Sequence, residues 1–214
     1  MKIRLPNFFT RHGATIKVNP KPIEGDIPEE LKRKTTPALM ESLNDADPFV
    51  RSLSCEVLGR LKERSSVQQL IKALQDHSKY VREKAAIALG IIGDRSAVPQ
   101  LIESLNDTSD EVRVTVAGVL GHLHDRLAVP ALITALADKS PMTRMKASIS
   151  LGLIGDPKAV NPLYALLQDE NELVRKYACE ALGNIGRLAV PALLMALKDE
   201  RVRSHAAQAM LKIK

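Results

Sequence analysis

The feature that most constrains this chain is one short module repeated six times between Pro37 and Lys214. Each copy carries an aspartate followed by an arginine, and successive arginines lie 31 residues apart four times and 28 residues apart at the last step. The pairs are Asp45 and Arg51, Asp76 and Arg82, Asp107 and Arg113, Asp138 and Arg144, Asp169 and Arg175, and Asp199 and Arg203. A fixed period of this length is typical of a solenoid, in which each unit buries its apolar face by stacking on its neighbours.

Each unit is predicted to form two short helices joined by a polar turn. In the third unit, apolar residues from Val98 to Leu105 recur at i, i+3, i+4 and i+7, and those from Val112 to Leu123 share a helical face in the same way. The polar residues 106–110 between them supply turn and helix-capping side chains. The prolines near the start of later units predict a kink or a tight opening turn there. The sequence therefore predicts an all-α fold of about six two-helix repeats.

Two columns of the repeat need a physical explanation. An arginine in the first turn of a helix faces the positive end of the helix dipole, so the preceding aspartate is expected to compensate it, within its own or the adjacent repeat. We interpret the six pairs as a structural ladder; the alternative is an exposed basic stripe.

A glycine inside a helix costs about 1 kcal/mol against alanine, so a repeated glycine predicts close helix packing or a helix end. The recurrent glycines are Gly59, Gly90, Gly121, Gly152 and Gly183. In the last repeat Leu211 stands at this position, which suits a C-terminal cap.

The repeat resembles a known family. The pattern Ala-Val-Pro-x-Leu-Ile-x-x-Leu, then Asp, Val-Arg and Ala-x-x-Leu-Gly-x-Ile-Gly-Asp, is similar to the short HEAT-like repeat of phycobilisome (phycocyanobilin) lyase subunits, over residues 37–214. The resemblance implies a right-handed α-α superhelix, a HEAT/armadillo-like solenoid, whose second helices line the concave surface. It also implies two functions, a protein-interaction scaffold or a subunit of a heterodimeric phycobilin lyase or chromophore-handling protein.

Charge separates an N-terminal segment from the repeats. Residues 1–36 carry +4 of the net charge of +6, and Met1 to Ile23 contain no acidic residue but include Phe8 and Phe9. We expect a basic arm and a short capping helix through Lys34 to cover the first repeat. The alternatives are an arm that recruits a partner, contact with a membrane surface, or an organelle transit segment. The domains are predicted as 1–36 and 37–214, with repeats at about 37–67, 68–98, 99–129, 130–160, 161–190 and 191–214.

A partner-binding strip is predicted on the concave side. In the central repeats, the outward positions of the second helices are largely apolar, whereas repeats one and six carry polar residues there. An apolar strip bordered by charge is typical of a protein-binding groove. The alternative is that helix rotation or the arm buries these side chains. The candidate residues are Lys84, Ile87, Ile91, His122, Met145, Ile149, Leu153 and Tyr177.

Other classes of function find little support. No histidine precedes a glutamate, unlike the His-Glu pairs of the di-iron HEAT hydroxylases, and His122, His124 and Asp125 alone are too few for a metal site. The chain has no tryptophan and few cations beyond the ladder, which argues against a nucleic-acid-binding protein, the third hypothesis. We therefore expect a non-catalytic protein without cofactor or metal, whose partner is another protein, with a heterodimer as one form of that complex.

The cysteines and the lengths of the apolar runs indicate the expected cellular compartment. Cys55 and Cys179 occupy the same column four repeats apart, on the order of 40 Å, far beyond the reach of a disulfide. They are predicted to be buried small residues in a reducing compartment, and we expect a cytoplasmic location. No apolar run is long enough to predict a transmembrane segment.

Overall fold

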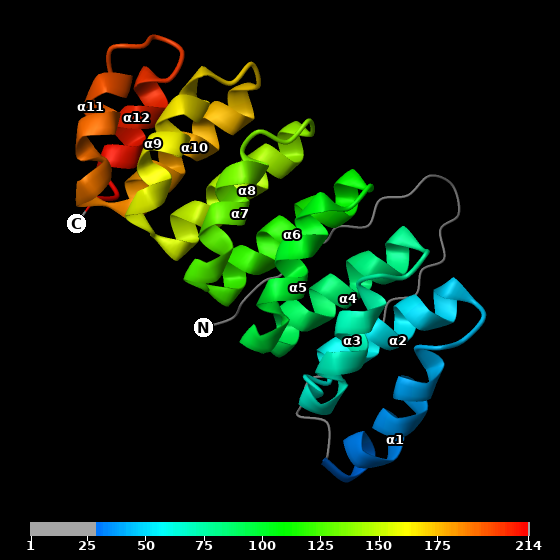
Figure 1. Ribbon diagram of the computed structural model, residues 1–214. Helices are drawn as coiled ribbons and strands as arrows, with labels where there is room; N and C mark the ends of the chain where they lie inside the picture. Colours follow the sequence, from blue (N-terminus) through cyan, green and yellow to red (C-terminus); the bar gives the residue numbers. More distant parts are fainter. Residues whose placement is uncertain (1–28, 214) are drawn as a thin grey trace, which may run out of the picture.

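A computed structural model describes residues 29–213, which form twelve α-helices in six stacked pairs (Figure 1). Turns and short 3-10 segments join them, and no strand occurs in this part of the chain. The first helices are α1 (Glu29–Ser42), α3 (Val67–Ala73), α5 (Val98–Glu103), α7 (Val129–Ala135), α9 (Val160–Ala165) and α11 (Val190–Ala196). The second helices are α2 (Pro48–Arg60), α4 (Lys79–Ile92), α6 (Asp110–Leu123), α8 (Pro141–Ile154), α10 (Glu172–Ile185) and α12 (Arg203–Met210). The predicted all-α solenoid of six two-helix units is confirmed.

A tight turn opens each first helix from the second repeat onward. A 3-10 segment of three residues precedes α3, α5, α7, α9 and α11, and an acidic side chain caps four of these five segments. Asp156, for example, accepts a hydrogen bond of 2.9 Å from the Lys158 N–H. Pro99, Pro130 and Pro191 then sit in the first turn of α5, α7 and α11, where their missing N–H has no intrahelical acceptor. The predicted tight opening turn is confirmed.

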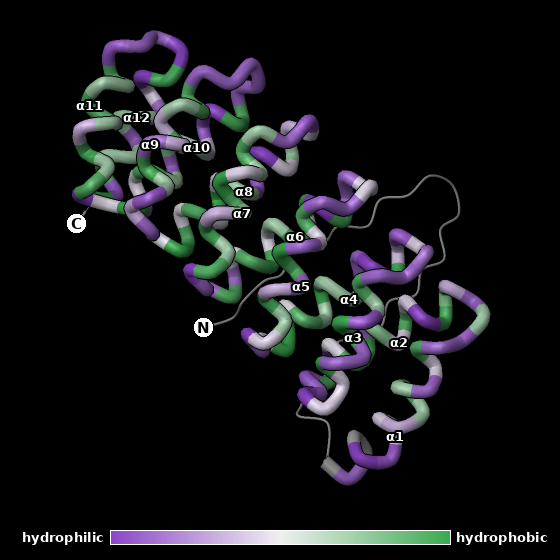
Figure 2. The backbone as a smooth tube through the Cα atoms, in the orientation of Figure 1, coloured by the Kyte–Doolittle hydropathy of each residue, from purple (hydrophilic) through white to green (hydrophobic). Residues whose placement is uncertain are grey.

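The core runs along the interface of the two helix rows. Each unit from the second to the fifth contributes one fully buried leucine from its first helix and one from its second, such as Leu101 and Leu120 in the third. The second helices also pack directly on one another along the stack, whereas neighbouring first helices touch far less. The second helices therefore form the inner, more tightly packed row. Figure 2 shows hydrophilic residues gathered in the turns at the helix ends.

The glycine column marks close contact between successive second helices. A Cβ added at Gly59 would lie 2.7 Å from Ala88 Cα, and one added at Gly152 would lie 2.7 Å from Ala181 Cα. Both glycines lie within their helices, so the column reports close packing and not a helix end. Leu211, which follows α12 in the same column, leaves 87% of its surface exposed.

The start of the solenoid differs from the prediction. We expected a capping helix that ends at Lys34 and a separate first helix in repeat one, but α1 is continuous from Glu29 to Ser42 and crosses the predicted boundary. Pro37 lies inside it, at the outer end of the stack, and cannot donate the helical bond to the Arg33 carbonyl. Residues 1–28, with Phe8 and Phe9, lie outside the described residues, so the expected capping role of the arm stays a prediction.

Both cysteines are free and buried. Burial raises the pKa of the Cys55 thiol to about 12, and it does the same for Cys179. Thiols with such pKa values remain protonated at neutral pH and are poor nucleophiles and metal ligands. They serve as small buried residues of the core.

Candidate partner-binding surface

The aspartate–arginine ladder joins each repeat to the next. Arg82 donates from Nε and Nη2 to the two carboxylate oxygens of Asp107, at 2.6 and 2.7 Å. Its Nη1 donates to the backbone oxygen of Asp76, 2.9 Å away in its own repeat. Three further rungs have the same geometry: Arg51 with Asp76, Arg113 with Asp138, and Arg144 with Asp169.

Each internal ladder carboxylate accepts hydrogen bonds both from an arginine and from a backbone N–H. Besides its arginine, Asp107 accepts a hydrogen bond of 2.8 Å from the Ser109 N–H, which fixes the turn before α6. Arg113 is only 5% exposed and Arg144 only 9%. Bidentate, partly buried pairs of this kind order the stack and leave little guanidinium surface for a partner. The ladder is therefore structural, and these four arginines do not form an accessible basic stripe.

The ends of the ladder depart from the predicted pairing. Arg175 donates from Nη1 to the Asp169 backbone oxygen at 2.8 Å, and its buried Nε has no partner in the described chain. Asp199 is bound instead by Arg201, whose Nη2 lies 2.9 Å from Asp199 Oδ2. Arg203 donates to the Leu197 carbonyl at 3.1 Å. Shortening of the last repeat shifts the aspartate by one residue relative to the preceding arginine, which breaks the rung.

Of the two partners expected for each aspartate carboxylate, the arginine of its own or of the adjacent repeat, the structure shows the adjacent one. The side-chain carboxylate of each internal aspartate binds the arginine of the preceding repeat, and only its backbone oxygen binds the arginine of its own. At the first repeat, the Asp45 carboxylate accepts a bond of 2.8 Å from the Asp47 N–H and has no ion pair within residues 29–213. Among residues 29–213, no repeat lies before this one to supply an arginine.

Ladder geometry lowers the pKa of its carboxyl groups. Burial alone would raise the pKa of Asp138, yet the Arg113 guanidinium and the Ser140 N–H hold it below its ordinary value. The same balance lowers the pKa of Asp107 and Asp169. Because the folded pKa lies below the unfolded one, near 3.8, each group stabilises the fold fully above that pH. The stabilisation is lost as the pH falls through the folded value.

We expect the free energy of unfolding to stay nearly level from pH 7 to pH 5 and to fall below about pH 4. Urea titrations at pH 7, 5 and 3 measure it. A matched Arg113→Ala/Asp138→Ala variant lacks one rung and should lose less stability between pH 5 and pH 3 than the parent chain. An equal loss in both proteins would contradict the role of the ladder in acid sensitivity.

The predicted partner-binding residues all lie on the outward side of the inner helix row. Ile91 and Leu153 are 39% and 40% exposed, and His122 is exposed near the end of α6. The remaining five are half-buried between neighbouring second helices: Lys84, Ile87, Met145, Ile149 and Tyr177. The eight residues thus lie on one face, and Ile91 and Leu153 are the most accessible apolar residues among the eight.

Ion pairs neutralise the two ends of this face. Glu56 lies 2.6 Å from Lys84 Nζ and 2.5 Å from Arg60 Nη2. Burial alone would raise the pKa of Glu56, but these two cations hold it below its ordinary value. At the other end, Glu180 lies 3.9 Å from Lys212. Between these ends, Glu83 accepts a hydrogen bond of 3.3 Å from Thr115 Oγ1, and the isoleucines and Gly118 contribute apolar surface.

A column of apolar side chains on the same face was missed by sequence reasoning. Phe49, Tyr80, Met142 and Leu173 lie in the first turn of their second helices, two residues before the ladder arginine, and are 70%, 46%, 50% and 52% exposed. The signal was present, because an apolar residue stands two positions before the ladder arginine in four repeats. With Leu53, Ile91 and Leu153, they make seven of the thirteen exposed large hydrophobic residues in the described chain.

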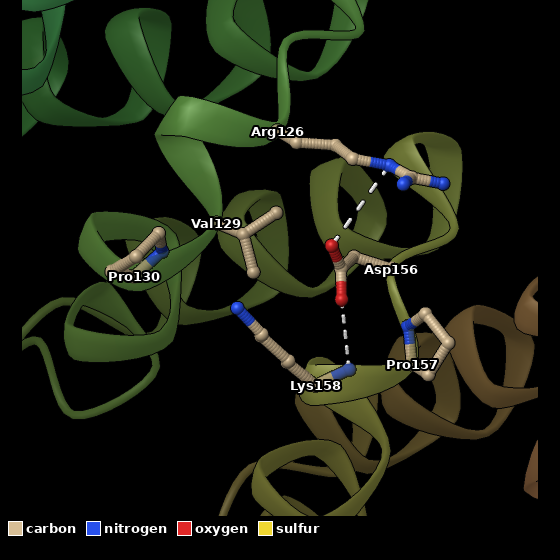
Figure 3. Close-up of a pocket in the computed structure, with 6 residues that line it drawn as sticks. All are labelled: Arg126, Val129, Pro130, Asp156, Pro157 and Lys158. Carbon is tan, nitrogen blue, oxygen red and sulfur yellow. Dashed lines mark hydrogen bonds and ion pairs between the residues drawn. The ribbon is translucent and has the colours of Figure 1, made fainter.

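The cavities offer no comparable site. A shallow cavity of about 490 Å³ lies where α7 and α9 begin, lined by Arg126, Val129, Pro130, Asp156, Pro157 and Lys158 (Figure 3). Its polar groups interact with one another, because Asp156 accepts a hydrogen bond from the Lys158 backbone N–H and its carboxylate lies 4.0 Å from Arg126 Nε. Across residues 29–213, no group of three or more His, Cys, Asp or Glu could hold a metal ion.

None of the helices between residues 29 and 213 combines the length and apolar character needed to cross a membrane.

Comparison with known proteins agrees with this architecture. The profile of the family described as HEAT repeats matches residues 36–113, 98–172 and 160–214. The chain is similar to the complex of CpcE and CpcF of phycocyanin lyase from Nostoc sp. PCC7120, at 26% identity and a TM-score of 0.65, over 92% of this chain and 81% of that chain. No curated protein matches the chain.

Two artificial proteins share the fold. An engineered protein matches at 22% identity and a TM-score of 0.60, over 82% of this chain and 94% of that one. A designed armadillo repeat protein in complex with the peptide (KR)4 matches at 21% identity and a TM-score of 0.59, over 83% and 99% of the two chains. At these identities the similarity concerns the fold alone.

Proposed function

Because the chain belongs to the HEAT-repeat family, we propose that it is a non-catalytic scaffold that binds another protein on the outward face of its second helices. The observation that carries this proposal is the gathering of seven exposed large hydrophobic residues on that one face. Soluble proteins rarely expose a large contiguous apolar patch unless a partner covers it. The neutralised ends and apolar centre give the face the apolar-core, polar-rim pattern of protein interfaces.

Three aromatic side chains suit the role of anchors. Phe49 and Tyr80 are 70% and 46% exposed, and Tyr177 is half-buried further along the same face. Aromatic residues bury a large area for little loss of side-chain freedom, and tyrosine is enriched among residues that dominate binding energy. Their spacing over repeats one, two and five favours an elongated partner segment that lies along the stack.

We expect Ile91→Glu/Leu153→Glu to abolish capture of the native partner from cell extract, because it places charge in the apolar centre of the face. Both side chains are about two-fifths exposed, so the free energy of unfolding should change by less than about 1 kcal/mol. Tyr164→Glu/Leu194→Glu is the matched control, since these residues are 39% and 49% exposed on first helices. Affinity purification followed by identification of the co-eluting chain gives the readout. Equal capture by both variants would refute the proposal.

A second candidate function follows from one comparison. The chain is 26% identical to a chain of the CpcE–CpcF complex of phycocyanin lyase over 92% of its length. A chromophore-handling subunit of a heterodimer is therefore the alternative to a plain scaffold. Mixing the purified chain with phycocyanobilin should then shift the visible absorption spectrum of the pigment, and an unchanged spectrum would count against this function.

A further inference from the structure

Repeats four and five leave two cations unmatched on the partner-binding face. Lys146 of α8 and Lys176 of α10 are half-buried, and neither forms an ion pair within residues 29–213. Three carboxylates of the same face are in ion pairs, Glu56 with Lys84, Glu111 with Lys79, and Glu180 with Lys212, while Glu83 of repeat two accepts a hydrogen bond of 3.3 Å from Thr115 Oγ1. Over repeats four and five, the face therefore carries positive charge that no ion pair within residues 29–213 neutralises.

The stem of Lys146 and the ammonium group of Lys176 each lie close to a neighbouring residue of the face. The Lys146 stem leans over Gly118, its Cδ 3.9 Å from the position that a Cβ there would take. Lys176 Nζ lies 5.7 Å from the centre of the Tyr177 ring. Met142 lies four residues before Lys146 and Leu173 three before Lys176, so each cation shares a helical face with a residue at least half exposed.

From this juxtaposition we propose that the face binds an amphipathic helix of another protein whose apolar stripe is bordered by carboxylates. Its apolar side chains would cover Met142, Leu153 and Leu173, while its carboxylates pair with Lys146 and Lys176. A helix laid into a groove presents apolar and charged residues side by side in this way. The inference rests on the proposed function and specifies the chemistry of the partner.

Charge also argues against residues 1–23 of this chain as the segment that binds this face. Residues 1–23 contain five basic residues and no acidic one, so they would bring like charge to Lys146 and Lys176. An acidic segment gains two attractive pairs at the same place. Partly buried ammonium groups are screened less by salt than fully exposed ones, which strengthens this preference.

Two synthetic peptides test the inference. Both are 18-residue amphipathic helices with leucine at i, i+3, i+4 and i+7 positions; glutamate borders the leucine stripe in one and lysine in the other. Fluorescence anisotropy with the full-length chain should show binding of the glutamate peptide and about tenfold weaker binding of the lysine peptide. Lys146→Glu/Lys176→Glu should reverse the order, whereas Lys72→Glu/Lys198→Glu, with the same charge change at exposed sites off this face, should preserve it.

Three outcomes would overturn the inference. Equal binding of the two peptides, lost in Ile91→Glu/Leu153→Glu, would leave the apolar face as a docking site without a charge preference. Stronger binding of the lysine peptide would favour a basic occupant, such as residues 1–23. Binding of neither peptide would reject the amphipathic helix, while capture of the native partner would still decide the proposed function independently.

Discussion

Arg113→Ala is expected to lower the free energy of unfolding by about 3 kcal/mol, since removal of one partner of a buried ion pair leaves the other charge without compensation. Arg113 is 5% exposed and binds both carboxylate oxygens of Asp138, at 2.7 and 2.9 Å. It also bonds to the Asp110 carboxylate and to the Asp107 backbone oxygen, at 2.7 and 2.8 Å. The substitution therefore cuts the link between repeats three and four as well as the turn before α6.

Urea denaturation followed by circular dichroism measures this loss, with Glu103→Ala as the control. Glu103 is exposed at the end of α5, so its substitution should cost under about 0.5 kcal/mol. The double variant Arg113→Ala/Asp138→Ala should be less destabilised than the sum of the two single variants, because the second substitution removes the orphaned charge. Additive effects would show that the pair is not coupled and would contradict the ladder.

Gly121→Ala is expected to destabilise the fold by about 2 kcal/mol, although alanine is the better helix former by about 1 kcal/mol. The added Cβ would lie 2.6 Å from Ser150 Cβ and 2.8 Å from Ser150 Cα. Ser150 cannot simply turn away, since its buried hydroxyl donates to the Ala117 carbonyl at 2.7 Å. Helices α6 and α8 must therefore move apart or lose this bond.

Gly118→Ala is a control in the same helix with the opposite expected sign. A Cβ at Gly118 would touch only the Lys146 Cδ, at an ordinary 3.9 Å. The gain in helix propensity should then appear as a stabilisation of about 0.5 to 1 kcal/mol. Thermal denaturation of the two variants separates close packing from propensity, and a similar change in melting temperature for both would disprove the close approach of α6 and α8.

Much of the architecture follows from residue spacing alone. The 31-residue period, the i, i+3, i+4, i+7 pattern and the recurrent glycine each constrain local structure, so the six helix pairs were predictable. Pro37 misled the prediction at the start of the chain, because a proline more often opens a helix than lies within one. At the end, the shortened last repeat hid that Arg201 and not Arg203 binds Asp199.

The candidate surface was predictable only in part. The spacing identified Ile91 and Leu153 as outward residues of the central repeats, and both are exposed. It did not identify Phe49 or Tyr80, because an apolar residue at the start of a helix can turn toward the core or toward solvent with equal local cost. Only the stacked neighbours show that these two rings face outward.

The order of residues dictates which positions recur and therefore which local structures form, because helix periodicity, capping and the cost of glycine act over a few neighbouring residues. The tertiary structure determines which repeat supplies the carboxylate for each arginine, which glycine contacts the next helix and which cations form no ion pair. Arg113 meets Asp138, 25 residues away, only after two units have stacked. Such partners depend on the spacing and rotation of whole helices, and the order of residues along one helix does not specify these.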